Sequence, residues 1–281
     1  MLRKFVTAVA AIVILTGCAP ELKHLTRICP GKQSLSQSLD SLRLTSESIA
    51  SLKATGRCNA RFYVEDKKHR ESFPVTLWLN PPGQMRLHGD LFLNRRGIVL
   101  GSNEREFWLA MKPREISSYH WGLWSEQGSS GGLMISPKTV LEALGIVAIG
   151  GDESWSLSNE GPFDVLTQRN REGKITKKIY IYSCHYQTSK IEYYNTDGEV
   201  AIVADLYKYK EISEGFYAPR VIRLTTYAQD GRKDTFRFTL KSIKPYKFDR
   251  EKQDIYFKRR PPKGFKHVYR IIDGSVIEQP Q

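Results

Sequence analysis

The sequence predicts a mainly β protein of the α+β class, in which one large antiparallel sheet of roughly eleven strands curls around two helices. Three observations support this prediction. Apolar and polar residues alternate with a period of two through most of the chain after residue 56. Turn residues separate these runs at short, regular intervals, and parallel strands would need crossovers of a dozen or more residues. Two segments show helical periodicity instead, and each has an apolar face to bury.

The chain opens with the features of a lipoprotein signal peptide. Arg3 and Lys4 precede an apolar run that ends in Leu15-Thr16-Gly17-Cys18, the pattern of a secretory signal followed by a bacterial lipobox. The apolar run is shorter than the roughly 20 residues of a membrane-spanning helix. We therefore expect residues 1–17 to be removed and Cys18 to carry palmitate and further acyl chains.

The lipid also predicts where the protein resides. Stable anchoring takes at least two acyl chains, and a lipobox cysteine carries three. In enterobacterial lipoproteins an aspartate after the acylated cysteine signals retention at the inner membrane. Ala19 and Pro20 follow Cys18 instead, so we expect the protein at the periplasmic face of the outer membrane. Residues 18–33 are then a lipidated tether, and residues 34–281 are one domain.

Composition favours one globular domain with a core, since 40% of the 281 residues are hydrophobic and 26% are charged. The formal charge is +13, and loss of Arg3 and Lys4 leaves 41 basic and 30 acidic residues. In the cell envelope this excess predicts anionic headgroups or an acidic protein as partners, and no nucleic acid.

Three cysteines remain once Cys18 is acylated: Cys29, Cys58 and Cys184. An oxidising compartment permits at most one intramolecular disulfide among them, and the sequence leaves all three pairings open. We favour Cys29 with Cys58, because that bond would fix the tether to the start of the domain.

The first expected helix starts at Ser34, which has capping-box spacing to Gln37. Apolar residues then recur at helical intervals, and Gly56 is expected to end the helix. These apolar residues are Leu35, Leu39, Leu42, Ile49 and Leu52.

Short strands follow in the first half of the chain. They are expected at residues 61–64, 75–79, 85–88, 98–100 and 106–109. Residues 119–132 are rich in Gly, Ser and Trp and are expected to form a long loop. Ser136 and Pro137 then provide an N-cap and a first-turn proline for a short helix that ends at Gly145.

The second half is the clearest β sequence. Strands are expected at residues 165–168, 175–183, 190–194, 200–209, 217–227 and 235–243. The intervening Glu172-Gly173, Asp197-Gly198 and Asp230-Gly231 pairs predict tight hairpins.

These features together resemble the lipoprotein-localisation family of LolA and LolB. The matching features are the lipobox, the capped helix before a meander, the mid-chain helix at Ser136-Pro137, the two Asp-Gly hairpins, Tyr217-Ala218-Pro219-Arg220, and Phe257 with Pro261, Pro262 and Gly264. The resemblance implies an unclosed β-barrel whose helices cover the open side, with an apolar cavity for acyl chains. The receptor of that family is itself a lipoprotein, which places Cys18 on the receptor side.

The resemblance and the alternation give candidate site residues. The expected cavity wall comprises Trp78, Leu87, Trp108, Ile181, Ile202, Ile222, Phe236 and Phe238. A receptor-like membrane-insertion loop would comprise Leu91, Phe92 and Leu93, and the alternative is that these residues continue a half-buried strand. Trp121 and Trp124 have no counterpart in the family. They either gate the cavity or lie at a membrane interface, or they are core aromatics.

No catalytic pattern is evident. Cys184 and His185 are adjacent on an expected strand, so their side chains point to opposite faces and cannot form a nucleophile–base pair. The six histidines lack metal-ligand spacing, and no cofactor or metal is expected. The densest basic cluster, residues 258–266, is either a solvated face or a headgroup contact.

We therefore expect a membrane-anchored lipoprotein without enzymatic activity that binds the acyl chains of a lipid or lipoprotein for transport or insertion at the outer membrane. The alternative is a structural, assembly or sensor lipoprotein that uses the same half-barrel to dock a protein.

Overall fold

The computed structural model describes residues 29–64, 66–91, 94–113, 116–126, 136–146, 154–228 and 230–280. The strands are β1 (Leu52–Val64), β2 (Lys67–Asn80), β3 (Gln84–Leu91), β4 (Asn94–Ser102), β5 (Glu106–Met111), β6 (Ser118–Leu123), β7 (Ser154–Glu160), β8 (Phe163–Arg169), β9 (Ile175–Tyr182), β10 (Gln187–Tyr194), β11 (Val200–Ser213), β12 (Phe216–Tyr227), β13 (Lys233–Pro245), β14 (His267–Ile272) and β15 (Ser275–Glu278). The helices are α1 (Leu35–Glu47), α2 (Pro137–Ala143) and α3 (Arg250–Phe257), with a 3₁₀ turn η2 (Trp124–Glu126).

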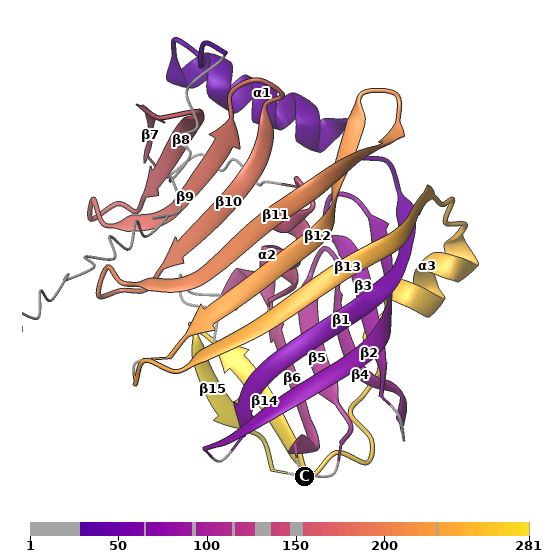
Figure 1. The fold of residues 1–281 in the computed structure, drawn as a ribbon. Helices are drawn as coiled ribbons and strands as arrows, with labels where there is room; N and C mark the ends of the chain where they lie inside the picture. The colour runs from indigo at the N-terminus through magenta and orange to yellow at the C-terminus, as the bar shows by residue number, and fades with distance from the viewer. Residues whose placement is uncertain are drawn as a thin grey trace, which may run out of the picture.

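All of these strands belong to one sheet of 15 strands, in the order β15-β14-β6-β5-β4-β3-β2-β1-β13-β12-β11-β10-β9-β8-β7. Every described pairing is antiparallel except that of β6 with β14. The sheet curls, because α2 contacts both β4 and β11 although five strands lie between them (Figure 1). β15 and β7 remain as edges, which confirms the predicted unclosed, mainly β architecture.

The structure has four more strands than the sequence predicted: β6, β7, β14 and β15. β6 occupies the start of the segment that was expected to be a loop, so that prediction was wrong for residues 119–123. Its glycine explains the error: a Cβ on Gly122 would lie 2.7 Å from the Phe107 ring, so here glycine makes room for a neighbouring strand's side chain.

The N-terminal ends of the two predicted helices are confirmed. The Ser34 hydroxyl accepts from the Gln37 backbone N–H at 3.3 Å, and the Ser136 hydroxyl accepts from the Thr139 N–H at 3.1 Å. Each cap satisfies an N–H group that has no partner inside the helix. The predicted end of α1 was wrong, because the helix stops at Glu47 and residues 52–56 begin β1.

Gly56 lies at a bulge between β1 and β13 rather than at a helix end. A Cβ there would lie 2.2 Å from the Thr239 carbonyl oxygen. We expect Gly56→Ala to lower the free energy of unfolding by about 1–3 kcal/mol or more, because the backbone of β13 must move. Urea unfolding measures this. Gly83→Ala is the control, since its Cβ would meet nothing closer than 3.8 Å; an equal loss in both variants would contradict the steric explanation.

The predicted hairpins are confirmed. Gly173, Gly198 and Gly231 have φ values of 79°, 81° and 80°, the left-handed conformation that favours glycine. In the first two turns an asparagine side chain adds stability: Asn195 Oδ1, for example, accepts from the N–H groups of Asp197 and Glu199 at 3.0 and 2.8 Å.

The core lies on the concave side of the curled sheet. Alternate side chains from most strands point inward and pack with α1 and α2, which lie in and over the hollow (Figure 1). The third helix, α3, was not predicted. It packs against β3 on the outer face of the sheet, where Tyr256 stacks on Trp78 with 4.7 Å between ring centroids.

The predicted Cys29–Cys58 disulfide was wrong. Cys29 bonds to Cys184, which follows β9. Cys58 points from β1 into the core, is 1% exposed, and is a free thiol whose pKa burial raises to about 12. The bond, together with the Lys32 N–H donating to Asp164 at 2.7 Å, fixes the end of the expected tether to the domain.

A candidate ligand-binding face in the hollow of the sheet

The hollow contains most of the predicted cavity-wall residues. Leu87, Ile181, Ile222 and Phe238 are buried members of the concave core, and Phe236 is half-buried against it. Ile202 is half-buried on β11, two residues before Ala204, whose side chain is in that core. Because side chains two apart share a face of a strand, Ile202 also points into the hollow.

Two predicted wall residues lie on the other face. Trp78 is covered by α3, and Trp108 packs in a separate outer cluster with Val99, Ala110 and Tyr119. The prediction put both tryptophans on the wrong face, because β2 and β5 carry apolar residues on their concave and their outer faces alike. The C-terminal segment and α3 bury the outer face there, so alternation does not reveal which side is concave.

The segment predicted as a membrane-insertion loop falls where β3 ends and β4 begins. Leu91 is the last residue of β3, pairs with Asn94 and packs half-buried against the concave core. This favours the continued-strand alternative for Leu91. Phe92 and Leu93 lie outside the described residues, as do Cys18 and the predicted signal peptide, residues 1–17.

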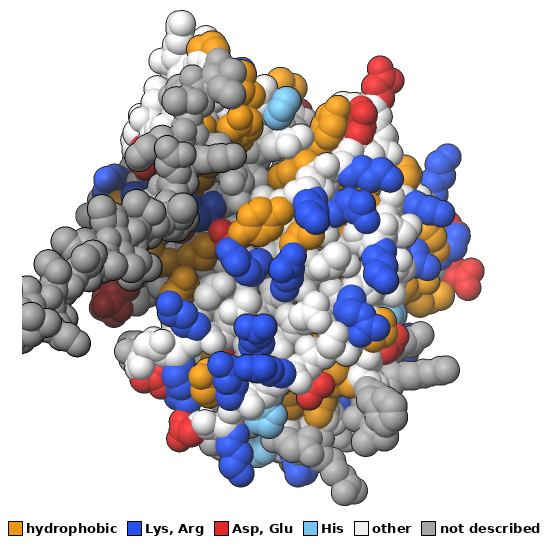
Figure 2. All heavy atoms as spheres, viewed as in Figure 1, with side chains coloured by type: hydrophobic (Ala, Val, Ile, Leu, Met, Phe, Trp, Pro, Cys, Tyr) orange, Lys and Arg blue, Asp and Glu red, His pale blue; other side chains and the backbone are white. Residues whose placement is uncertain are grey.

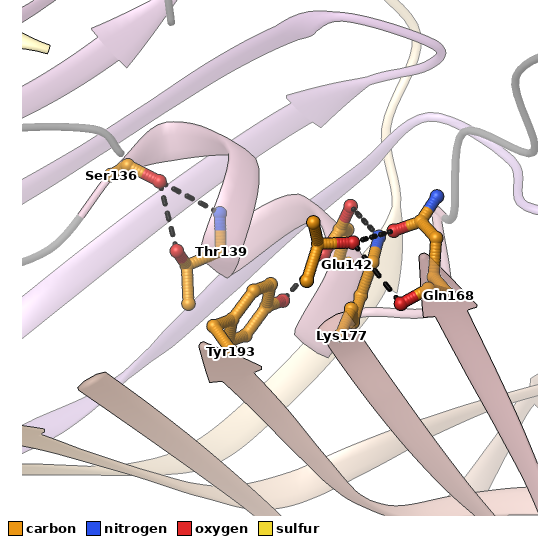
Figure 3. A network of polar contacts seen from close by, with 7 residues as sticks. Ser136, Thr139, Glu142, Gln168, Lys177 and Tyr193 are labelled. Atoms are coloured by element: carbon orange, nitrogen blue, oxygen red, sulfur yellow. Dashed lines mark hydrogen bonds and ion pairs between the residues drawn. The ribbon is translucent and has the colours of Figure 1, made fainter. Parts of the chain in front are cut away.

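An ion pair is buried in the hollow between α2 and β9 (Figure 3). Lys177 Nζ lies 2.9 Å from Glu142 Oε1, with side chains 5% and 2% exposed. The Tyr193 hydroxyl donates to the other Glu142 oxygen, and Gln168 lies beside the pair. Burial first, and then the negative charge of Glu142, raise the pKa of Tyr193 well above its ordinary value, so Tyr193 stays a neutral donor.

The pair determines where α2 lies. A seven-residue helix has little stability of its own, because nucleation is unfavourable and few hydrogen bonds repay it. Val140, Leu141 and Leu144 bury its apolar side in the core, while Glu142 joins it to β9 and β10. Sequence reasoning missed Glu142 and Lys177, because the two residues are 35 positions apart in the chain and no local signal connects them.

Trp155 of β7 lies near this pair. Lys177 Nζ is 5.8 Å from its ring centroid, and the ring packs against the concave core. The Trp155 indole N–H is buried and has no hydrogen-bond acceptor within the described part of the chain. It is a donor that a polar atom of a ligand could use.

A second hollow lies between α3 and the β4–β5 turn. It is an open groove of about 470 Å³ with mostly polar walls, among them Asn103, Arg105, Glu106 and Lys258. Much of this polarity is satisfied internally: Asn103 donates to the Phe257 carbonyl at 3.0 Å, and Arg259 pairs with Glu106 at 2.6 Å. Its polar lining makes it a poorer acyl site than the concave face.

The Trp121 and Trp124 side chains form part of the packing. The Trp121 indole N–H donates to Gln279 Oε1, and the guanidinium carbon of Arg259 lies 4.2 Å from the centroid of the Trp121 ring. Trp124 donates to the Asn103 carbonyl at 2.7 Å and packs against the concave core. These contacts favour the core-aromatic alternative. Trp121 also engages Arg259, a member of the basic cluster at residues 258–266.

Among the described residues, no group of three or more His, Cys, Asp and Glu side chains could hold a metal ion. Cys184 is oxidised in its disulfide and so is no nucleophile. Burial lowers the pKa of His120, which stacks on Tyr269 at 4.7 Å. In the same described ranges, no helix combines the length and apolar character needed to cross a bilayer.

No protein-family model matches the sequence, and neither does any curated protein. Solved structures do match. A putative outer membrane lipoprotein-sorting protein domain from Vibrio parahaemolyticus is 12% identical with a TM-score of 0.56, over 77% of this chain and 94% of that one. A LolA superfamily protein from Nitrosomonas europaea is 13% identical with a TM-score of 0.53, over 79% and 97%.

The chain has a LolA-like fold. A DUF1329 family protein from Desulfovibrio piger shares it, with 12% identity and a TM-score of 0.53 over 79% of this chain and 96% of that one. The predicted resemblance is thus confirmed for the fold. At these identities the LolA-like fold leaves the role open, because one scaffold serves several functions.

Proposed function

We propose that the protein is a non-enzymatic envelope lipoprotein, anchored through Cys18 at the periplasmic face of the outer membrane, that binds acyl chains of a lipid or lipoprotein on its concave face for transport or insertion. The observation that supports this most is the broad apolar inner face of a wide, unclosed sheet, against which α1 and α2 pack among the described elements. Half-buried residues of this face, such as Ile202 and Phe236, would contribute about 25 cal/mol for each Å² of apolar surface that an acyl chain covers.

The polar groups in the hollow fit the head end of such a ligand. The Trp155 N–H is a buried donor without an acceptor among the described residues. A carboxylate or ester oxygen of a lipid would satisfy it, while the chain lies along Ile202, Phe236 and their neighbours.

One observation favours the docking alternative. α2 occupies the hollow and is fixed there by Glu142 and Lys177. An acyl ligand must fit beside α2 or displace it. A protein-docking scaffold has no such requirement.

The test is native mass spectrometry with lipid extraction of protein from its own envelope, prepared as wild type and as Cys18→Ser. The substitution removes the predicted covalent acyl groups, so lipid recovered from it is bound non-covalently. We expect lipid to remain with Cys18→Ser in gentle ionisation and to dissociate on unfolding. Repeated recovery of no acyl ligand would contradict acyl binding and favour the docking alternative.

Binding should map to the concave face. With cis-parinaric acid as the probe, we expect Phe236→Ser and Trp155→Phe each to weaken binding about fivefold, for a loss of about 1 kcal/mol of apolar contact or one hydrogen bond. Thr235→Ala is the control, because Thr235 is next to Phe236 but points to the outer face. Equal loss in the control would place the probe elsewhere.

A further inference from the structure

The outer face of the sheet has a strongly one-signed charge over its central strands. β1, β12 and β13 contain nine Lys or Arg residues and one acidic residue. The whole chain has 43 Lys or Arg residues and 30 Asp or Glu residues. Figure 2 shows these side chains gathered over the surface that faces away from α1 and α2. Asp234, the one acidic residue, accepts from the Tyr63 N–H at 3.0 Å.

Like charges face one another across neighbouring strands. Lys53 pairs with Lys244, Arg61 with Arg70, and Arg223 with Arg237. Directly opposed residues of an antiparallel pair project from the same face with Cβ atoms about 5 Å apart, so like charges there are destabilising. Antiparallel sheets ordinarily place opposite charges or neutral pairs at such positions.

The fold compensates little of this charge. Asp205 pairs with Arg223 at 2.9 Å. Within the described residues, Arg61, Arg70 and Arg237 form no ion pair with a carboxylate. We call Lys53, Arg57, Arg61, Arg70, Arg237 and Lys244 the basic face. Within the face, Arg57 donates to Ser72 at 3.2 Å and Lys53 Nζ lies 5.7 Å from the centroid of the Trp78 ring, but neither contact neutralises a charge. Because opposed like charges cost stability, the arrangement points to an anionic ligand outside the chain.

The shape and composition of the basic face fit a membrane. It lies on long, adjacent strands of one sheet, so its charges are spread over a broad surface rather than around a pocket. Tyrosines lie among or beside them: Tyr207 and Tyr227 are 40% and 38% exposed, and cations lie 5.6 and 5.1 Å from their ring centroids. Tyrosine rings are favoured at the membrane–water interface, where Lys and Arg attract anionic headgroups.

We propose that the basic face binds the phosphate-bearing surface of an anionic phospholipid membrane. This contact is separate from the acyl-binding face, because it uses the opposite side of the sheet, and it does not depend on the proposed function. It would orient the domain with its hollow turned away from the membrane surface that it contacts.

Vesicle co-sedimentation tests this with the chain from residue 19 onward, so that neither a lipid anchor nor the apolar segment with Arg3 and Lys4 masks the contact. The vesicles are phosphatidylcholine alone or phosphatidylcholine mixed with phosphatidylglycerol, at low and high salt. We expect binding only to the mixed vesicles, and less of it at high salt. Arg61→Gln/Arg237→Gln/Lys244→Gln should weaken it about a hundredfold, at about fivefold per charge near the surface.

The matched control removes three charges from the other basic cluster, as Lys258→Gln/Lys263→Gln/Lys266→Gln. It should retain binding within severalfold. Equal loss in both triple variants would mean that net charge alone acts, and unchanged binding in the basic-face variant would overturn the proposal directly. Tighter binding of a DNA duplex than of the vesicles would also overturn it. Thermal unfolding shows that the variants fold, and the basic-face variant should be at least as stable as wild type, because opposed like charges are removed.

Discussion

Replacing Lys177 with methionine should lower the free energy of unfolding by about 3–5 kcal/mol, the cost of leaving a buried charge without its partner. The Glu142 and Lys177 side chains are 2% and 5% exposed, so water cannot take the place of the lost ammonium group. Glu142→Leu should cost a similar amount. Urea unfolding at neutral pH measures both.

The double variant distinguishes a buried pair from two independent side chains. Replacing both partners of a buried ion pair with apolar residues is often neutral or stabilising. We therefore expect Glu142→Leu/Lys177→Met to be much more stable than the sum of the single changes implies, particularly with Tyr193→Phe added to remove the orphaned hydroxyl. Strictly additive losses would show that the two side chains do not interact in solution.

The same variants bear on the function. If acyl chains enter by displacing α2, loosening its attachment should raise the affinity for cis-parinaric acid, since less free energy is needed to open the hollow. Under the docking alternative neither wild type nor Lys177→Met binds the probe. The buried pair therefore connects the stability of α2 to the choice between the two functions.

The features that local sequence predicted correctly have local causes. Ser34 and Ser136 bond to N–H groups three residues away, and the hairpin glycines need only their own backbone angles. The eleven expected strands follow from alternation that each strand carries by itself. The general architecture followed because these elements can bury their apolar faces in few ways.

The errors have causes that are distant in the sequence. Gly56 was expected to end a helix, but the Thr239 carbonyl in another strand requires it. Trp78 was assigned to the concave face because α3, which covers it, comes about 170 residues later. Glu142 resembled the polar side of an amphipathic helix, and only the fold brings Lys177 to it. Each depends on tertiary contacts that a single sequence does not state.

The cysteine pairing was wrong for the same reason and supports a second large prediction. Cys29 and Cys184 are separated by 155 residues. In the chain-entropy model a loop of this length adds up to about 5 kcal/mol to stability, and measured values are commonly about 2–4 kcal/mol. We expect Cys29→Ser or Cys184→Ser to lower the free energy of unfolding within this range.

The loss should extend to the contacts beside the bond. The Ser183 hydroxyl donates to the Cys29 carbonyl at 3.1 Å, and the Lys32 N–H donates to the buried Asp164. Once Cys29 is released, the N-terminal segment is free to move and these hydrogen bonds weaken. The start of α1 then loses its attachment to β8 and β9. Hydrogen exchange should therefore rise at residues 29–40 before it rises in the central strands.

Cys58→Ala decides between the two pairings. Cys58 is a free thiol in the core, so this variant should keep its disulfide. Its mass under denaturing conditions should be that of a chain with one disulfide. On reduction it should lose as much stability as wild type does. Addition of reductant to Cys29→Ser should change nothing further. If instead Cys58→Ala abolished the response to reductant while Cys184→Ser retained it, the bond would join Cys29 to Cys58, and the N-terminal segment would be held by β1 rather than by the β9–β10 turn.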